Sequence, residues 1–298
     1  MPSERPAPSP MNSHSIQRDS HRGQQTLLAS LIAQYSQLQA ILRLEPSGKF
    51  LNLLEADPTI EHVMVTLSEA ESVLRNHGGF DNILQPHHKL TIVGTEPDPT
   101  VTDRGRWAEI DLYAEITREA RIIPDWLWVY HQMEPEHQLE NVRKYLDRFE
   151  WLYQTAEEMG LSHELIPLAK GLSQPHFKEA RETFARLGID RFAMYGVQTP
   201  SNYEFRDRIH QAATALNPEG VLVIGRGSPR QVEVLPGIVD EAAGWYWKQD
   251  CGLTTDGYSQ QRLAMWIYEI KRALETERTD EQSRIGDYLP DSGVVING

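Results

Sequence analysis

Polar side chains and glycines follow six consecutive apolar segments of this 298-residue sequence. Carboxylates in such positions can act as nucleophiles or general bases, and lysine or arginine can bind an anion. If the apolar segments are parallel strands, these side chains meet at the edge of the sheet where active sites of α/β barrels lie. The candidates are Glu96 and Asp98, His131 and Gln132, Lys170 and Gly171, Gly196 and Gln198, Gly225 with Arg226 and Gly227, and Lys248 with Asp250.

The segment from Gly225 to Pro229 has two interpretations. Its glycines, its guanidinium and the start of a helix favour an anion site, but an ordinary strand-to-helix turn would need the same glycines. Lys170 directly follows a buried segment, so we expect it to pair with Asp250 or Glu96, or to bind phosphate.

Neither a metal ion nor another cofactor is expected. His131 and His137 have no third ligand in an obvious register, and Cys251 is the one cysteine of the chain. A zinc site built from several cysteines and an internal disulfide are therefore excluded.

Predicted strands and helices alternate along the chain, and they position the candidate residues. Short apolar runs rich in β-formers predict strands buried on both faces. These runs are His62–Leu67, Leu90–Gly94, Trp126–Tyr130, Leu165–Ala169, Arg191–Tyr195, Val221–Gly225 and Gly244–Lys248. Apolar spacings of three and four residues predict helices at Leu27–Leu44, Glu136–Met159, Pro175–Leu187, Ser201–Leu216 and Tyr258–Thr276, with a short helix after Ser228.

Strands alternating with helices predict an α/β fold, either a (β/α)8 TIM-type barrel of parallel strands or a doubly wound open sheet. The barrel is favoured because no glycine-rich dinucleotide loop follows the first strands. An eighth strand is not apparent, and an extra helix precedes the barrel. We expect a disordered Pro/Ser/Arg-rich leader at 1–24, one barrel domain at 25–276 and a polar C-terminal tail at 277–298.

Composition narrows the class of protein. Hydrophobic residues make up 40% and charged residues 24%, as in a globular domain. No apolar run approaches the roughly 18 residues that a membrane-spanning helix needs. The N-terminus has no apolar core of a secretory signal, so a cytoplasmic location is expected. The net charge of −14 argues against non-specific binding of polyanions but permits a local basic groove.

Three segments of the second half carry a family resemblance. They are LIPLAKG (165–171), RLGIDRFAMYGVQTPSN (186–202) and VLVIGRGSPRQVEVLPGIVDEAAGWYWKQDC (221–251). Their order and spacing resemble the barrel of the tRNA-guanine transglycosylases. Strands of that family end in Gln-Gly, Gly-Gly-Leu, Gly-Val-Gly-Thr-Pro and Asp-Cys. The corresponding residues here are Lys170-Gly171, Tyr195-Gly196-Val197, Gly225 to Pro229, and Asp250-Cys251. PDWLWVYHQM and the helix after it add to the match, which covers about half of the chain.

The resemblance implies a pentosyltransferase. In that family the aspartate of Asp-Cys attacks C1′ of a nucleotide, guanine leaves, and a 7-deazaguanine base replaces it, as in queuosine and archaeosine formation. A carboxylate suits this step because C1′ develops oxocarbenium character. By resemblance Asp250 is the nucleophile, and Glu96 or Asp98 is the second carboxylate, a base or stabiliser. The remaining candidates are expected to bind substrate.

The sequence departs from the family at several positions. The Asp-Ser-Gly-Gly-Phe signature is absent, and the chain reads IVGTEPDPT there. His131 or Gln132 stands where the family has a base-binding aspartate, and Lys170 stands in place of its glutamine. The zinc cluster is missing. Because no RNA-binding domain is apparent after residue 276, the resemblance favours the shorter relatives that modify DNA rather than tRNA.

Two alternatives remain open. The chain could be a non-catalytic paralogue that binds nucleic acid or serves as a partner subunit, which the altered recognition residues favour. It could also be an unrelated barrel enzyme that binds a small phosphorylated substrate at Gly225–Gly227. Expected partners are nucleic acid, a 7-deazaguanine base, and a protein partner or a second copy of the chain.

Overall fold

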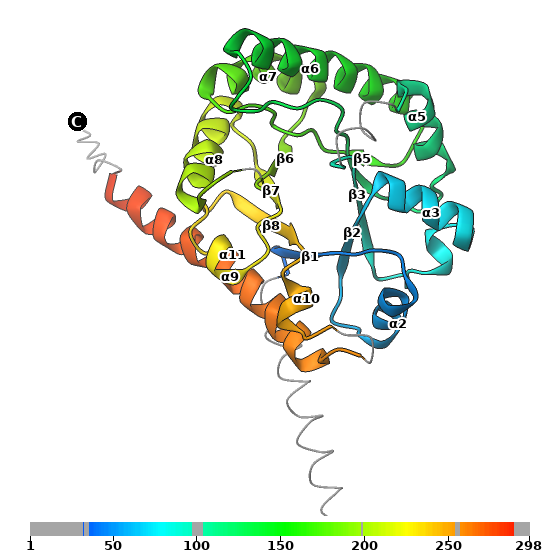
Figure 1. The fold of residues 1–298 in the computed structure, drawn as a ribbon. Coiled ribbons are helices and arrows are strands. Elements are labelled where there is room, and N and C mark those ends of the chain that lie inside the picture. The colour runs from blue at the N-terminus through cyan, green and yellow to red at the C-terminus, as the bar shows by residue number, and fades with distance from the viewer. Residues whose placement is uncertain (1–31, 33–35, 97–103, 198, 254–256, 289–298) are drawn as a thin grey trace, which may run out of the picture.

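The computed structural model describes residues 32, 36–96, 104–197, 199–253 and 257–288. They form an α/β fold around one eight-stranded sheet, in which every pair of neighbouring strands is parallel. The strand order is β5-β4-β3-β2-β1-β8-β7-β6, so neighbours in the sheet are mostly neighbours in the chain. Figure 1 shows the sheet curled, with the helices lying on its outer side.

The strands are β1 (Gln39–Arg43), β2 (His62–Thr66), β3 (Lys89–Val93), β4 (Arg121–Ile123), β5 (Glu164–Leu165), β6 (Arg191–Tyr195), β7 (Gly220–Ile224) and β8 (Val239–Gly244). The helices are α2 (Gly48–Ala56), α3 (Leu67–His77), α5 (Arg106–Glu115), α6 (Pro135–Glu158), α7 (Gln174–Leu187), α8 (Asn202–Leu216), α9 (Pro229–Val232), α10 (Trp247–Asp250) and α11 (Gln260–Tyr288), with a 3-10 turn η1 at Phe80–Asn82. No helix among the described residues is both long and apolar enough to cross a membrane.

Most predicted elements are confirmed. The strands predicted around β2, β3, β6 and β7 agree within a residue or so, and β5 covers the start of its predicted strand. The three central helices α6, α7 and α8 also agree. Ser201 caps α8 by accepting a hydrogen bond from the backbone N–H of Glu204 at 3.1 Å. Helix α11 extends to Tyr288, past the predicted end at Thr276.

Three predicted elements are wrong. The predicted strand Trp126–Tyr130 is irregular, and its neighbour Arg121–Ile123 pairs with β3 and β5 instead. Pro124, which has no N–H to donate, follows that strand at once. The predicted strand Gly244–Lys248 contains only the last residue of β8. The predicted helix Leu27–Leu44 has strand β1 in its second half, which supplies the eighth strand.

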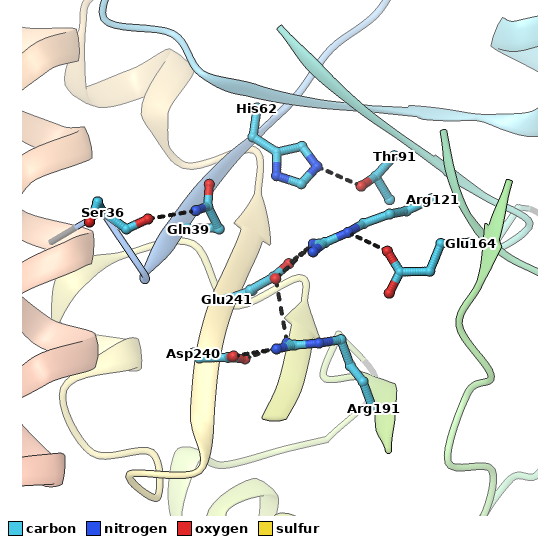
Figure 2. Close-up of polar contacts among 9 residues, drawn as sticks. All are labelled: Ser36, Gln39, His62, Thr91, Arg121, Glu164, Arg191, Asp240 and Glu241. Carbon is cyan, nitrogen blue, oxygen red and sulfur yellow. Dashed lines mark hydrogen bonds and ion pairs between the residues drawn. The ribbon is translucent and has the colours of Figure 1, made fainter. Parts of the chain in front are cut away.

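A charged network joins the amino ends of four strands (Figure 2). Arg121 of β4 donates to both carboxylate oxygens of Glu241 of β8, at 2.7 and 2.6 Å. Arg191 of β6 binds both oxygens of Asp240 at 2.7 and 2.6 Å, and its Nη1 lies 3.4 Å from Glu241. Glu164 of β5 accepts from Arg121 at 2.9 Å. Because the Glu241 side chain is only 3% exposed, these bonds are needed to offset the burial of its charge.

Candidate functional site

A pocket of about 550 Å³ lies at the opposite end of the sheet, beyond the carboxyl ends of β3 to β6. Both acidic and basic side chains reach it, together with three aromatic rings. In (β/α) folds this end of the sheet is where catalytic residues gather. The lining residues are Thr95, Glu96, Asp125, Trp128–Tyr130, His131, Gln132, Leu168–Leu172, Tyr195 and Arg208.

An ion pair between Asp125 and Lys170 forms one wall of the pocket. Asp125 follows β4, and its side chain is 6% exposed. The Nζ of Lys170 binds Oδ1 of Asp125 and donates to the carbonyl of Leu127 at 2.5 Å. It also lies 5.5 Å from the ring centroid of Tyr145. Lys170 is therefore held in one position with its charge beside the pocket.

Gly94 allows this wall to form. A Cβ at Gly94 would lie only 2.6 Å from the backbone nitrogen of Asp125, so a side chain there would push the two strand ends apart. The lysine pairing differs from the one predicted, because Lys170 binds neither Asp250 nor Glu96.

Glu96 is a buried carboxylate with an unused acceptor. Its side chain is 2% exposed, and Oε1 accepts from the backbone N–H of Ser68, in the first turn of α3, at 2.6 Å. Helix N-termini favour negative charge, which explains why a carboxylate is tolerated there. Oε2 lies 3.6 Å from Nη1 of Arg104 and has no hydrogen-bond partner among the described residues. This oxygen is thus a buried acceptor without a hydrogen-bond partner among the described residues.

Further charges lie beside the pocket, at the carboxyl ends of β1 and β8. Arg43, the last residue of β1, lies 3.4 Å from Glu69 and 5.1 Å from the ring of Trp245. Burial lowers the pKa of Arg43, although Glu69, Tyr195 and Glu96 oppose the shift. The cluster places a guanidinium near the pocket carboxylate.

Lys248 belongs to this neighbouring cluster and is not among the residues that line the pocket. Its Nζ lies 3.6 Å from the ring centroid of Trp245 and 3.4 Å from Glu45. Burial lowers the pKa of Lys248, with Glu45 opposing. Trp247 is fully buried in the core, whereas Trp245 is 38% exposed.

Asp250 lies elsewhere. It ends α10, past the end of β8, and borders a separate cavity with Arg262 and Trp266 of α11. Burial raises its pKa, with Arg262 opposing. The structure thus does not bring Asp250 and Glu96 into one pocket, and the nucleophile role of Asp250 stays a prediction.

The segment after β7 is built by close packing. The guanidinium of Arg226 is buried and donates to the carbonyl of Thr199 at 2.6 Å and to Oδ1 of Asn202 at 3.0 Å. A Cβ on Gly227 would lie 2.9 Å from the Cα of Gly244, so glycine is needed there. Gly225 has φ of +90°, which also favours glycine.

The remaining candidates fall into three groups. His131 and Gln132 are exposed and line the pocket mouth. Gly171 also lines the pocket; its φ of +135° and its close approach to the Cβ of His176 require glycine. Gly196 lies against the Phe205 ring and the stem of Arg226. Asp98 and Gln198 lie outside the described residues.

Sequence reasoning missed Asp125, Tyr195 and Arg208 as pocket residues. Asp125 was recoverable, because Pro124-Asp125 directly follows the apolar Ile122-Ile123. Arg208 gives no comparable signal, since it lies in a helix of mixed charge. No cluster of three metal-ligating side chains is present in the described part of the chain.

No family model matches the chain, and no curated protein matches it.

Proposed function

We propose that this protein exchanges a nucleobase on nucleic acid, replacing guanine with a 7-deazaguanine in a pocket of a (β/α)8 barrel. The observation that carries the proposal is the meeting of Glu96, Asp125 and Lys170 in one pocket at the carboxyl ends of parallel strands. DNA is the proposed substrate rather than tRNA, following the resemblance to the shorter relatives.

Closure of the barrel is part of the proposal. Leu168, just beyond β5, forms a parallel bridge with Ala193 of β6, the strand at the other end of the sheet order. Two backbone hydrogen bonds support the bridge, from Ala169 N–H to the Ala193 carbonyl at 2.9 Å and from Ala193 N–H to the Pro167 carbonyl at 2.8 Å. We infer that this segment joins the two ends of the sheet.

The pocket wall fits the edge of a guanine-like base. Such a base presents two neighbouring N–H donors and one carbonyl acceptor. A carboxylate accepts from the donors, and an ammonium group donates to the carbonyl, so Asp125 and Lys170 offer the matching pair. Trp128 and Tyr130, stacked with their planes 18° apart, add apolar surface to the wall.

Glu96 is the proposed carboxylate at C1′. Its Oε2 forms a bond to C1′ while the glycosidic bond breaks, and guanine leaves with the bonding electrons and takes up one proton. The incoming 7-deazaguanine gives up one proton, attacks C1′ and releases the Glu96 carboxylate, so the exchange is balanced. The unused, buried Oε2 supports this role, whereas Asp250 borders a different cavity.

The test is mass spectrometry of nucleosides from DNA and tRNA of cells that express the chain together with 7-deazaguanine biosynthesis. We expect a modified deoxynucleoside in wild type and in Asp250→Asn, and none in Glu96→Gln. Loss in Asp250→Asn with retention in Glu96→Gln would instead assign the nucleophile to Asp250. A modified ribonucleoside would move the substrate to tRNA.

A second candidate is a non-catalytic, nucleic-acid-binding paralogue or partner subunit. One observation favours it: β8 ends in Ala243-Gly244, so no carboxylate stands at the end of this strand. The two candidates separate in the same assay, because the paralogue would bind nucleic acid and leave both nucleoside pools unmodified. Cytoplasmic location and self-association stay predictions.

A further inference from the structure

Two arginines near the pocket share one aromatic ring. The guanidinium carbons of Arg208, from α8, and Arg226, from the segment after β7, each lie 5.5 Å from the ring centroid of Phe205. Arg208 lines the pocket beside Tyr195, the last residue of β6. Arg208 thus borders the pocket, and Arg226, which is not among the pocket-lining residues, is near enough for its charge to lower the pKa of Arg208.

Neither guanidinium has a carboxylate within ion-pair distance in the described part of the chain. Arg208 donates to the hydroxyl of Thr199 and to the carbonyl of Tyr195, both at 3.1 Å. Arg226 likewise donates to a carbonyl and a side-chain amide oxygen. All four acceptors are neutral, so the net charge of the pair is not compensated.

Other enclosed arginines of this fold have carboxylate partners. Arg148 binds the buried carboxylate of Glu109 at 2.8 Å, and Arg121 and Arg191 bind Glu241 and Asp240. Burial, together with the nearby charge of Arg226, lowers the pKa of Arg208 to about 10. Burying two like charges without a counterion is unfavourable, and a bound anion would offset it.

Both guanidiniums also retain donors. The Nε of Arg208 and the Nε of Arg226 are buried and have no hydrogen-bond partner among the described residues. A guanidinium offers N–H groups in a planar fork that matches the oxygens of phosphate. The pair thus combines uncompensated charge with unused donors.

We propose that Arg208 and Arg226 form a phosphate subsite at the edge of the pocket. It holds the phosphodiester next to the nucleotide whose base enters the pocket. The placement of that base rests on the proposed function, whereas phosphate binding by the arginines does not. This phosphate contact adds to the proposed function a site that positions the nucleic-acid strand.

The test is thermal unfolding in phosphate-free buffer at constant ionic strength, titrated with inorganic phosphate or with a short oligodeoxynucleotide. The variants are Arg208→Gln and Arg226→Gln, and Arg230→Gln removes one charge from an exposed position nearby as the control. We expect saturable stabilisation of wild type and of the control, and binding weakened about tenfold or more in the two test variants.

The thermal stability of the variants without phosphate distinguishes a phosphate subsite from a purely structural role of the two arginines. Since Arg208→Gln removes an uncompensated buried charge, we expect it to unfold at or above the wild-type temperature without phosphate. Equal destabilisation with and without phosphate would overturn the subsite, as would equal weakening by Arg230→Gln. Saturation by inorganic phosphate alone would assign the subsite to free phosphate, and stronger binding of the oligonucleotide would assign it to the phosphodiester. Because no free 7-deazaguanine base is added and no exchange is measured, failure of base exchange leaves this result unaffected.

Discussion

Substituting Glu241 of β8 tests whether the charged network holds the amino end of the sheet together. The two oxygens of Glu241 take both hydrogen bonds from Nη1 of Arg121, and Arg191 lies 3.4 Å from it (Figure 2). The substitution Glu241→Gln keeps the shape of the side chain and removes its charge. Arg121 is then left with Glu164, whose side chain is 51% exposed and is a weaker counterion.

The expected loss of stability follows from burial. Removing one partner of a buried ion pair typically costs about 3–5 kcal/mol, because the remaining charge stays enclosed without compensation. For a domain of this size class that corresponds to a drop of the unfolding midpoint of roughly 10 °C. Residues of β4, β5, β6 and β8 contribute to the network (Figure 2), so the whole sheet should respond.

The assay is thermal and denaturant unfolding followed by circular dichroism. Glu179→Gln is the matched control, since it removes the same charge from the solvent-exposed pair with Arg143. We expect the control to leave the midpoint nearly unchanged, because exposed pairs contribute little. A loss in Glu241→Gln no larger than in the control would refute the view that this network holds the strand ends together.

Two further predictions concern protonation and a single hydrogen bond. Burial lowers the pKa of His88 to about 4, against about 6.5 when unfolded, so its stabilising contribution is present above pH 6.5 and is lost as pH falls towards 4. His88→Gln should flatten this part of the pH profile of denaturant unfolding, and an unchanged slope would contradict the assignment. Tyr145 accepts the backbone N–H of Leu168 at 2.7 Å, so Tyr145→Phe should cost about 1–3 kcal/mol. Tyr203→Phe, at a residue 72% exposed, serves as its control, and equal effects of the two would count against the bond.

The sequence predicted those elements whose local pattern and final environment agree. Arg191–Tyr195 is a continuous apolar run that becomes a strand with its centre buried, and α7 before it ends at Gly188 in the left-handed conformation. Strand β1 shows where the agreement ends. Leu38, Ile41 and Leu42 have helical spacing, but their segment pairs with β2 and β8, and β8 is distant in the sequence. Such long-range partners are not encoded in a local period.

The dependence on long-range packing also explains which pocket residues the sequence did and did not predict. Assigning the strand to Trp126–Tyr130 moved its predicted end past Asp125 and made His131 and Gln132 the strand-end candidates, although these two are exposed lining residues. Glu96 and Lys170 were identified because they directly follow apolar strands. Arg208 reaches the pocket from α8 and donates to the carbonyl of Tyr195 at the end of β6, a contact that the mixed charge of that helix does not indicate.

The most direct measurement of the central claim is calorimetric titration of the purified protein with a free 7-deazaguanine base. We predict saturable binding to wild type, binding weakened about tenfold or more in Asp125→Asn, and wild-type affinity in Asp250→Asn. Circular dichroism of each variant confirms that it is folded. Wild-type affinity in Asp125→Asn, or loss of binding in Asp250→Asn, would contradict the proposal that the base occupies the pocket of Glu96, Asp125 and Lys170.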